Sequence, residues 1–173
     1  MPQKLITPKF LTRAVAEASC TAVLRAVKEN RDLFPLDGDT HHIVVLVPGM
    51  EDGRPDYPAW PDYQLHPVTL FEHSRGEKSK WNFPFDDIAR CKAMQLWHDR
   101  NDDRTDCVPH LLFPGDTPYW GGVKRRGIVV TCSGYQPYFD KMISGMAADM
   151  MVARAHHAWL QSDDHANDRS FLK

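Results

Sequence analysis

Three stretches with helical periodicity divide this chain, and they constrain its fold more than any other feature. They extend over residues 8–30, 85–100 and 136–161. In each stretch apolar residues recur every three or four positions, which is typical of a helix with one buried face. Such helices gain most of their stability from packing, so the segments between them must supply an apolar partner surface.

The segments between these helices contain apolar, β-branched runs that have the length of strands. We expect strands over 42–47 and 68–73 after the first helix, and over 108–113 and 127–132 after the second. Gly121-Gly122 provides a hairpin turn between the last two. Because the helices lie between groups of strands, the sequence predicts an α+β fold, with helices packed on one antiparallel sheet.

Local signals mark the starts of two helices. Thr7 can cap the first helix, with Pro8 at the first helical position. Asp86 and Asp87 favour a helix start at Phe85, because negative charge is stabilised at the positive end of the helix dipole. These signals agree with the limits that the periodicity gives.

The third helix has the longest apolar stripe. Its members are Phe139, Ile143, Met146, Met150, Ala153, His157 and Leu160. Met142 and Met151 add to its methionine content, and methionine side chains adapt to irregular cores and interfaces. We expect a homo-oligomer that buries this Met-rich face between subunits; the wall of a haem pocket is the alternative.

The composition describes one domain of ordinary size with nearly balanced charge. The chain has 173 residues, of which 42% are hydrophobic, and a net charge of −2. We expect a single domain over 1–162, with a long irregular loop at 48–66 and a loosely held polar tail over 163–173. The charge excludes a strongly basic nucleic-acid-binding protein, although Lys124-Arg125-Arg126 forms a compact basic patch.

Location and redox state follow from what the sequence lacks. No apolar run is long enough to span a membrane, and the first residues have no signal-peptide pattern, so we expect a cytoplasmic protein without a membrane partner. The four cysteines have neither disulfide nor zinc-site spacing, which predicts free thiols. Of the nine histidines, His41 and His42 are adjacent and should point to opposite faces of a strand, so a protein-only zinc site is not expected.

Four short motifs follow one another in the second half of the chain. Residues 88–93 are Ile-Ala-Arg-Cys-Lys-Ala, residues 113–118 are Phe-Pro-Gly-Asp-Thr-Pro, residues 130–134 are Val-Thr-Cys-Ser-Gly, and Asp140 follows early in the third helix. In order and spacing they resemble the GlcG/HbpS family of small haem-binding proteins, which includes the C-terminal domain of PduO. The resemblance implies a profilin-like α-β-α sandwich that binds a small molecule.

The resemblance also implies a pocket between the sheet edge, the second helix and the Pro-Gly turn. The candidate catalytic groups are Lys92, to pair with a ligand carboxylate, and His73 or Asp116, to exchange protons. The candidate ligand-binding residues are Phe71, His73, Lys92, Gly115, Asp116, Tyr119 and Trp120. A surface lysine and a strand-end histidine without function are the alternative.

Haem is the cofactor that the resemblance implies, and haem needs an axial ligand in an apolar slot. The first helix lacks the histidine implicated in some members, so His157 on the third helix and Cys20 on the first are the candidates. A core or interface histidine and an inert buried thiol are the alternatives. Cys132 precedes a helix start that could lower a thiol pKa, but a packing role is favoured.

The sequence thus predicts an oligomeric binding protein for haem or another small acidic or apolar ligand. One alternative is an enzyme that acts on a small organic acid in the same pocket, with the 48–66 loop closing over it. A structural subunit of a larger complex is the other.

Overall fold

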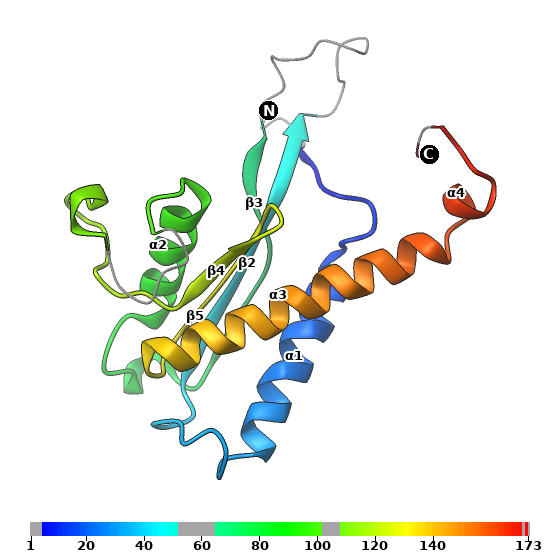
Figure 1. Cartoon of the computed structure of the whole chain (residues 1–173). Helices are drawn as coiled ribbons and strands as arrows, with labels where there is room; N and C mark the ends of the chain where they lie inside the picture. The colour runs from blue at the N-terminus through cyan, green and yellow to red at the C-terminus, as the bar shows by residue number, and fades with distance from the viewer. Residues whose placement is uncertain (1–4, 52–64, 102–107, 171, 173) are drawn as a thin grey trace.

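The computed structural model describes residues 5–51, 65–101, 108–170 and 172, and its centre is an antiparallel sheet (Figure 1). Short 3-10 helices at Lys78–Lys80 and Pro109–Leu111 interrupt the connections. The strands are β1 (Leu5–Ile6), β2 (His41–Glu51), β3 (His66–Arg75), β4 (Gly122–Arg125) and β5 (Ile128–Ser133). The helices are α1 (Arg13–Glu29), α2 (Phe85–Trp97), α3 (Pro137–Leu160) and α4 (Asp163–Ala166).

Strand β2 organises the sheet because three other strands pair with it. On one edge β3 pairs with β2 from His41 to Gly49, and on the other edge β5 pairs with it from His42 to Leu46. Strand β4 forms a hairpin with β5, and β1 pairs with the far end of β2. All of these pairings are antiparallel.

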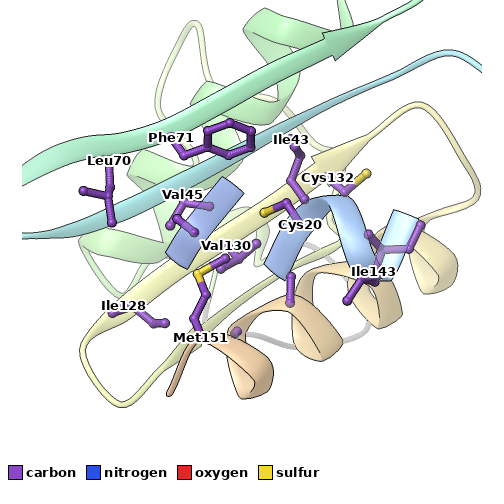
Figure 2. Close-up of a cluster of buried hydrophobic side chains, with 14 of the residues drawn as sticks. Cys20, Ile43, Val45, Leu70, Phe71, Ile128, Val130, Cys132, Ile143 and Met151 are labelled. Atoms are coloured by element: carbon purple, nitrogen blue, oxygen red, sulfur yellow. The ribbon is translucent and has the colours of Figure 1, made fainter. Parts of the chain in front are cut away.

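The two faces of β2 belong to two separate apolar layers. Ile43, Val45 and Val47 belong to the large core that α1 and α3 cover, and Figure 2 shows part of this core. The alternate residues Val44 and Leu46 pack against α2 on the opposite face. Helices therefore cover both faces of the sheet (Figure 1), and the predicted α+β fold is confirmed.

Helix α1 begins later than the sequence signals suggested. Thr12, not Thr7, is its N-cap, and the Thr12 side chain accepts a hydrogen bond from the Val15 N–H at 3.3 Å. Both threonines have a local sequence that permits capping. The chain before α1 instead provides β1 and the buried side chain of Leu11, and these tertiary contacts decide where the helix starts.

The predicted strand at 108–113 and the predicted hairpin turn are both wrong. Pro109 has no N–H for a strand ladder and begins a 3-10 helix instead. The hairpin turn lies at Arg126-Gly127, where both residues have positive φ, as a two-residue type I′ turn requires. Gly122 lies inside β4, and Gly121 precedes that strand.

The segments predicted to be irregular are more ordered than expected at their ends. Strand β2 continues through Pro48 to Glu51 and β3 begins at His66, while residues 52–64 of the predicted loop lie outside the described residues. In the predicted tail, the buried Asp164 forms ion pairs with Lys9 and Arg169. The tail is therefore docked against the rest of the domain.

The predicted apolar stripe of α3 is buried only near the start of the helix. Ile143 is fully buried, but Met146, Ala153, His157 and Leu160 are exposed. The helix has 24 residues and is thus about 36 Å long, so its last turns extend beyond the sheet (Figure 1), whereas Met151 still belongs to the core. The buried face of α3 consists of Ile143, Ala147, Ala148 and Met151, so Met146 is exposed because it lies on another side of the helix.

Candidate functional site

A buried ion pair between Lys92 of α2 and Asp140 of α3 is the centre of the candidate site. Lys92 Nζ lies 3.2 Å from Asp140 Oδ2, and both side chains are only 2% exposed. The ammonium group also donates to the main-chain carbonyl of Cys132 at 3.0 Å. One lysine therefore joins α2, the end of β5 and the start of α3.

The second carboxylate oxygen of Asp140 is also bonded, since Oδ1 accepts from the Tyr135 N–H at 3.2 Å. Burial raises the pKa of Asp140 to about 7, while Lys92 and the Tyr135 N–H lower it. Burial outweighs these stabilising contacts because removing a carboxylate from water is costly. The Asp140 carboxyl group thus titrates near neutral pH.

Two glycines allow the chain to approach this pair closely. Gly121 has φ +122°, and a Cβ there would lie 2.6 Å from the Asp140 Cβ and 2.8 Å from the Pro137 carbonyl oxygen. Gly134 has φ +142°, and its Cβ would lie 2.3 Å from the Thr40 carbonyl oxygen. A side chain at 121 would displace the segments that surround the pair, and one at 134 would displace Thr40 and His41 at the start of β2.

The ion pair forms part of the wall of a hollow of about 230 Å³, here called the inner hollow. Aromatic side chains from before and within α2, and from the turn before β4, form much of its wall. At about 30 Å³ for each water in the liquid, the volume corresponds to roughly eight water molecules. The lining residues are Phe83, Phe85, Ile88, Lys92, Tyr119, Ser133, Gly134, Tyr135, Gln136, Pro137 and Asp140.

A second hollow of about 440 Å³, the outer hollow, adjoins the inner one. The two share Phe83, Phe85 and the segment 134–136. The outer hollow extends to Asp37, Gly38, Thr40 and Asn82. A molecule that enters the inner hollow can therefore extend towards the end of the sheet where β2 begins.

Tyr135 connects the two hollows to the core through a buried histidine. Its hydroxyl group lies 2.8 Å from Nδ1 of His41. Burial lowers the pKa of His41 to about 4 and raises that of Tyr135, so both side chains are neutral at pH 7. This neutral pair holds the tyrosine ring at the wall without adding charge.

Of the predicted site residues, the structure brings Lys92 and Tyr119 together in the inner hollow. Asp116 lies outside that lining and pairs with Arg100, which lowers the pKa of the Asp116 carboxyl group. Asp116 also accepts a hydrogen bond from the Phe113 N–H at 2.8 Å. Gly115 lies in the same turn, and no heavy atom lies within 4 Å of the position that its Cβ would take. The Pro-Gly turn is therefore organised by its own contacts.

The structure separates the other predicted residues from Lys92. Phe71 pairs with Val45 and His73 with Ile43, so both point to the α1 and α3 face of the sheet, opposite α2. Phe71 is part of the core, and the exposed His73 ring stacks on it. Trp120 lines a third hollow of about 460 Å³ on α3. The prediction that these residues form one pocket is wrong.

The two candidate haem ligands occupy very different surroundings. Cys20 is buried in the core, where burial raises its pKa to about 12, whereas His157 is exposed on the outer half of α3. Neither residue lines the inner or the outer hollow. Cys132 is fully buried and its thiol pKa is raised well above its usual value, which agrees with the packing role.

The sequence reasoning missed several residues of the hollow. Phe83, Phe85, Tyr135 and Gln136 line it, and Asp140 was noted only as part of a motif. The density of aromatic residues over 81–85 was an available signal, since exposed aromatic clusters often line ligand pockets. The contribution of Tyr135 had no signal in the sequence, because it depends on how α3 meets β5.

The described part of the chain has neither a metal-binding cluster nor a helix suited to a membrane. It contains no group of three or more His, Cys, Asp or Glu side chains that could hold a metal ion. His41 and His42 lie on opposite faces of β2, as their adjacent positions predict. No helix in these residues combines the length and apolar character that crossing a membrane requires. Comparison with protein-family models, with curated proteins and with solved structures gave no match.

Proposed function

We propose that the inner hollow binds a small apolar molecule that carries a carboxylate group. The observation that carries this proposal is that Lys92, with its buried ammonium group paired to Asp140, is among the residues that line an aromatic hollow. Binding sites for small molecules combine apolar walls with a few polar groups that fix orientation. Lys92 provides such a group, and Phe83, Phe85 and Tyr119 provide the apolar wall.

The hydrogen-bonding capacity of Lys92 supports an acidic ligand. An ammonium group has three N–H donors, and the Cys132 carbonyl and Asp140 accept two of them. The N-terminus of α3, which begins at Pro137 in the same wall, adds the positive end of a helix dipole. Both features favour negative charge on the ligand.

The size of the hollow favours a small acid over haem. At about 230 Å³ the inner hollow is smaller than the roughly 300–1,000 Å³ of typical ligand pockets, so a large planar macrocycle would also need the outer hollow. The positions of Cys20 and His157 do not fit an axial ligand to haem bound there. A compact aromatic acid such as benzoate is the better probe.

The test is an NMR titration of the ¹⁵N-labelled protein with benzoate and, separately, with benzyl alcohol. We expect benzoate to shift the amide signals of residues 134–136 saturably, and benzyl alcohol to bind more weakly. Lys92→Met should weaken benzoate binding roughly tenfold or more, because a charge-assisted hydrogen bond contributes about 1.5–3 kcal/mol.

Lys124→Met is the matched control, since Lys124 also binds a main-chain carbonyl and an aspartate but lies outside the hollow. It should leave benzoate binding unchanged. Equal binding of benzoate and benzyl alcohol would show that the hollow does not select acids. No saturable shift with either probe would remove the proposal altogether.

A second candidate function is catalysis on the same class of ligand. A carboxyl group that titrates near pH 7 in a hollow, next to a lysine, suits general acid catalysis. It would donate its proton to the carbonyl oxygen of the ligand, and the neighbouring carbon would lose a proton to water. We propose phenylpyruvate as the probe, because it is an apolar acid with exchangeable protons. Exchange of these protons in D₂O should be faster with the wild type than with Asp140→Asn; equal rates would argue against catalysis.

We propose, third, that the protein forms homo-oligomers through α3. The third hollow combines Trp120, Tyr138 and Met146 with Arg125, residue types that are enriched at protein interfaces. Sedimentation equilibrium should give a mass above 19.8 kDa, and Met146→Glu should reduce it. A monomer at micromolar concentration would contradict self-association, whereas the ligand proposal would stand.

A further inference from the structure

We propose that the inner hollow takes up a proton together with its carboxylate ligand. The incoming carboxylate replaces Asp140 as the partner of Lys92, and Asp140 binds a proton from the solvent. This inference rests on the proposed function and adds how the site accommodates a second negative charge. One O–H bond forms on Asp140, and no other covalent bond changes.

The starting point is a site whose charge is already balanced. Lys92 and Asp140 are each 2% exposed, so water screens their charges poorly. Together they carry no net charge. An additional carboxylate would leave one uncompensated negative charge in a largely buried place, and such a charge is costly.

The described lining of both hollows offers no second cation to balance that charge. Facing Asp140 are Lys92 from α2, the Cys132 thiol from β5, and Tyr135 with its N–H. Gly121 approaches from the turn before β4 without a side chain, and on α3 itself the Ser144 hydroxyl donates to the Asp140 carbonyl. Of these groups only Lys92 carries a positive charge.

A proton from the solvent restores the balance, and Asp140 is the group that can accept it. Burial has already raised the pKa of Asp140 to about 7, whereas a benzoate-type carboxyl group titrates near the usual range of about 4. The nearby carboxylate of a ligand would raise the pKa of Asp140 further, because like charges disfavour ionisation. The protonated Asp140 could then donate its O–H to the ligand.

The sign of the pH dependence follows from this exchange. Binding requires protonated Asp140, so affinity should be greatest below pH 7 and nearly constant there. Above pH 7 each unit should weaken binding by up to about tenfold, because less of the free protein holds the proton. Above about pH 5 benzoate remains ionised, so its own titration does not contribute in that range.

The experiment is calorimetry of benzoate binding to the wild-type protein at pH 8, in HEPES and in Tris, two buffers with different ionisation enthalpies. The difference between the two observed binding enthalpies, divided by the difference between the ionisation enthalpies of the two buffers, gives the number of protons taken up. We expect between about 0.5 and 1 proton for each benzoate. Benzyl alcohol, which brings no charge, should give none.

Two variants test whether Asp140 is the group that binds the proton. Asp140→Asn should bind benzoate without proton uptake and without pH dependence. Asp163→Asn, which removes an exposed carboxylate of α4 that lines neither hollow, should behave like the wild type. If Asp140→Asn does not fold, the uptake measured on the wild type still decides whether a proton is bound.

The possible outcomes separate this inference from the proposed function. Benzoate binding with equal enthalpies in both buffers would overturn the proton uptake and leave the acid-binding hollow intact. Proton uptake that persists in a folded Asp140→Asn protein would show that another group takes the proton. Absence of benzoate binding would overturn both proposals.

Discussion

Gly121 is the residue on which the geometry of the ion pair depends most directly. Its φ of +122° suits glycine, and a Cβ would collide with the Asp140 Cβ and the Pro137 carbonyl oxygen. Gly115 also has positive φ, +94°, but nothing lies within 4 Å of its Cβ position. Substitutions at these two glycines therefore distinguish the cost of backbone strain from the cost of a steric collision.

We expect Gly121→Ala to cost more stability than Gly115→Ala. The alanine at 115 should cost about 1–2 kcal/mol through its backbone conformation alone. The alanine at 121 should cost a further 1–3 kcal/mol, because Asp140 and Pro137 must move. Urea denaturation of both variants gives the difference. Equal losses would show that the segments around Gly121 can relax.

His41 makes the stability of the protein sensitive to acid. Burial holds its pKa at about 4, below the value of 6.5 for an unperturbed histidine, with smaller effects from the charges of Arg75 and Asp39. Between pH 6.5 and 4 the unfolded chain binds more protons than the native protein does. Stability should therefore be lost as the pH falls through this range, by on the order of 2–3 kcal/mol.

The measurement is urea denaturation at pH 7 and at pH 5. His41→Asn should show a smaller loss of stability between these two values than the wild type, because its side chain does not titrate. His110→Asn is the control, since His110 is exposed. This variant should lose as much stability between pH 7 and pH 5 as the wild type does. If His41→Asn loses as much stability between pH 7 and pH 5 as the wild type does, other groups cause the acid sensitivity.

At the scale of elements, the start of α1 shows how competing local signals are resolved by tertiary structure. Thr12 caps the helix, whereas Thr7 lies in the segment that leads to it. We expect Thr12→Ala to cost about 1 kcal/mol and Thr7→Ala to have little effect. Thermal unfolding of the two variants distinguishes them. The opposite order would move the helix start back to Thr7.

The helices and strands themselves were largely predictable, because each has a periodicity that its own residues carry. Residues 85–97, for example, combine an apolar face with Asp86 and Asp87 in the first turn, and α2 begins at Phe85 as expected. Turns were less predictable. Gly121-Gly122 resembles a hairpin turn, but the φ of Gly121 and the lack of room beside both residues show that close packing explains these glycines.

The site was predictable only where a single element determines it. Lys92 was assigned to it from a motif on α2, and it does line the hollow. The sequence shows that Phe71 and His73 share a face of β3, but not which face of the sheet that is. The register of β3 on β2 decides this, and it places both opposite Lys92. Pairing between distant strands is information that no local pattern contains.

At the scale of the whole molecule, the last described segment is fixed to the first. Asp164 of α4 is buried and pairs with Arg169 and with Lys9, which precedes α1. The T-shaped contact of His165 with Trp159, 4.5 Å between ring centroids, holds α4 against the end of α3. The tail thus contributes charge pairing and packing to the domain.

We expect Asp164→Asn to loosen α4. Removing the charge leaves Lys9 and Arg169 without this partner, and the loss should be about 1–3 kcal/mol. Hydrogen exchange should accelerate in residues 163–169 and in the segment before α1, but not in β2. The exposed Asp163 provides the control, since Asp163→Asn removes a neighbouring charge that is not buried. Unchanged exchange in Asp164→Asn would show that the aromatic contact alone holds the tail.

The pairing of Lys9 with Asp164 also makes the segment before α1 and the short helix α4 interdependent. Residues separated by 155 positions in the sequence meet there, so the polypeptide follows a nearly closed ring. A truncation that removes α4 would also free the segment that leads into α1.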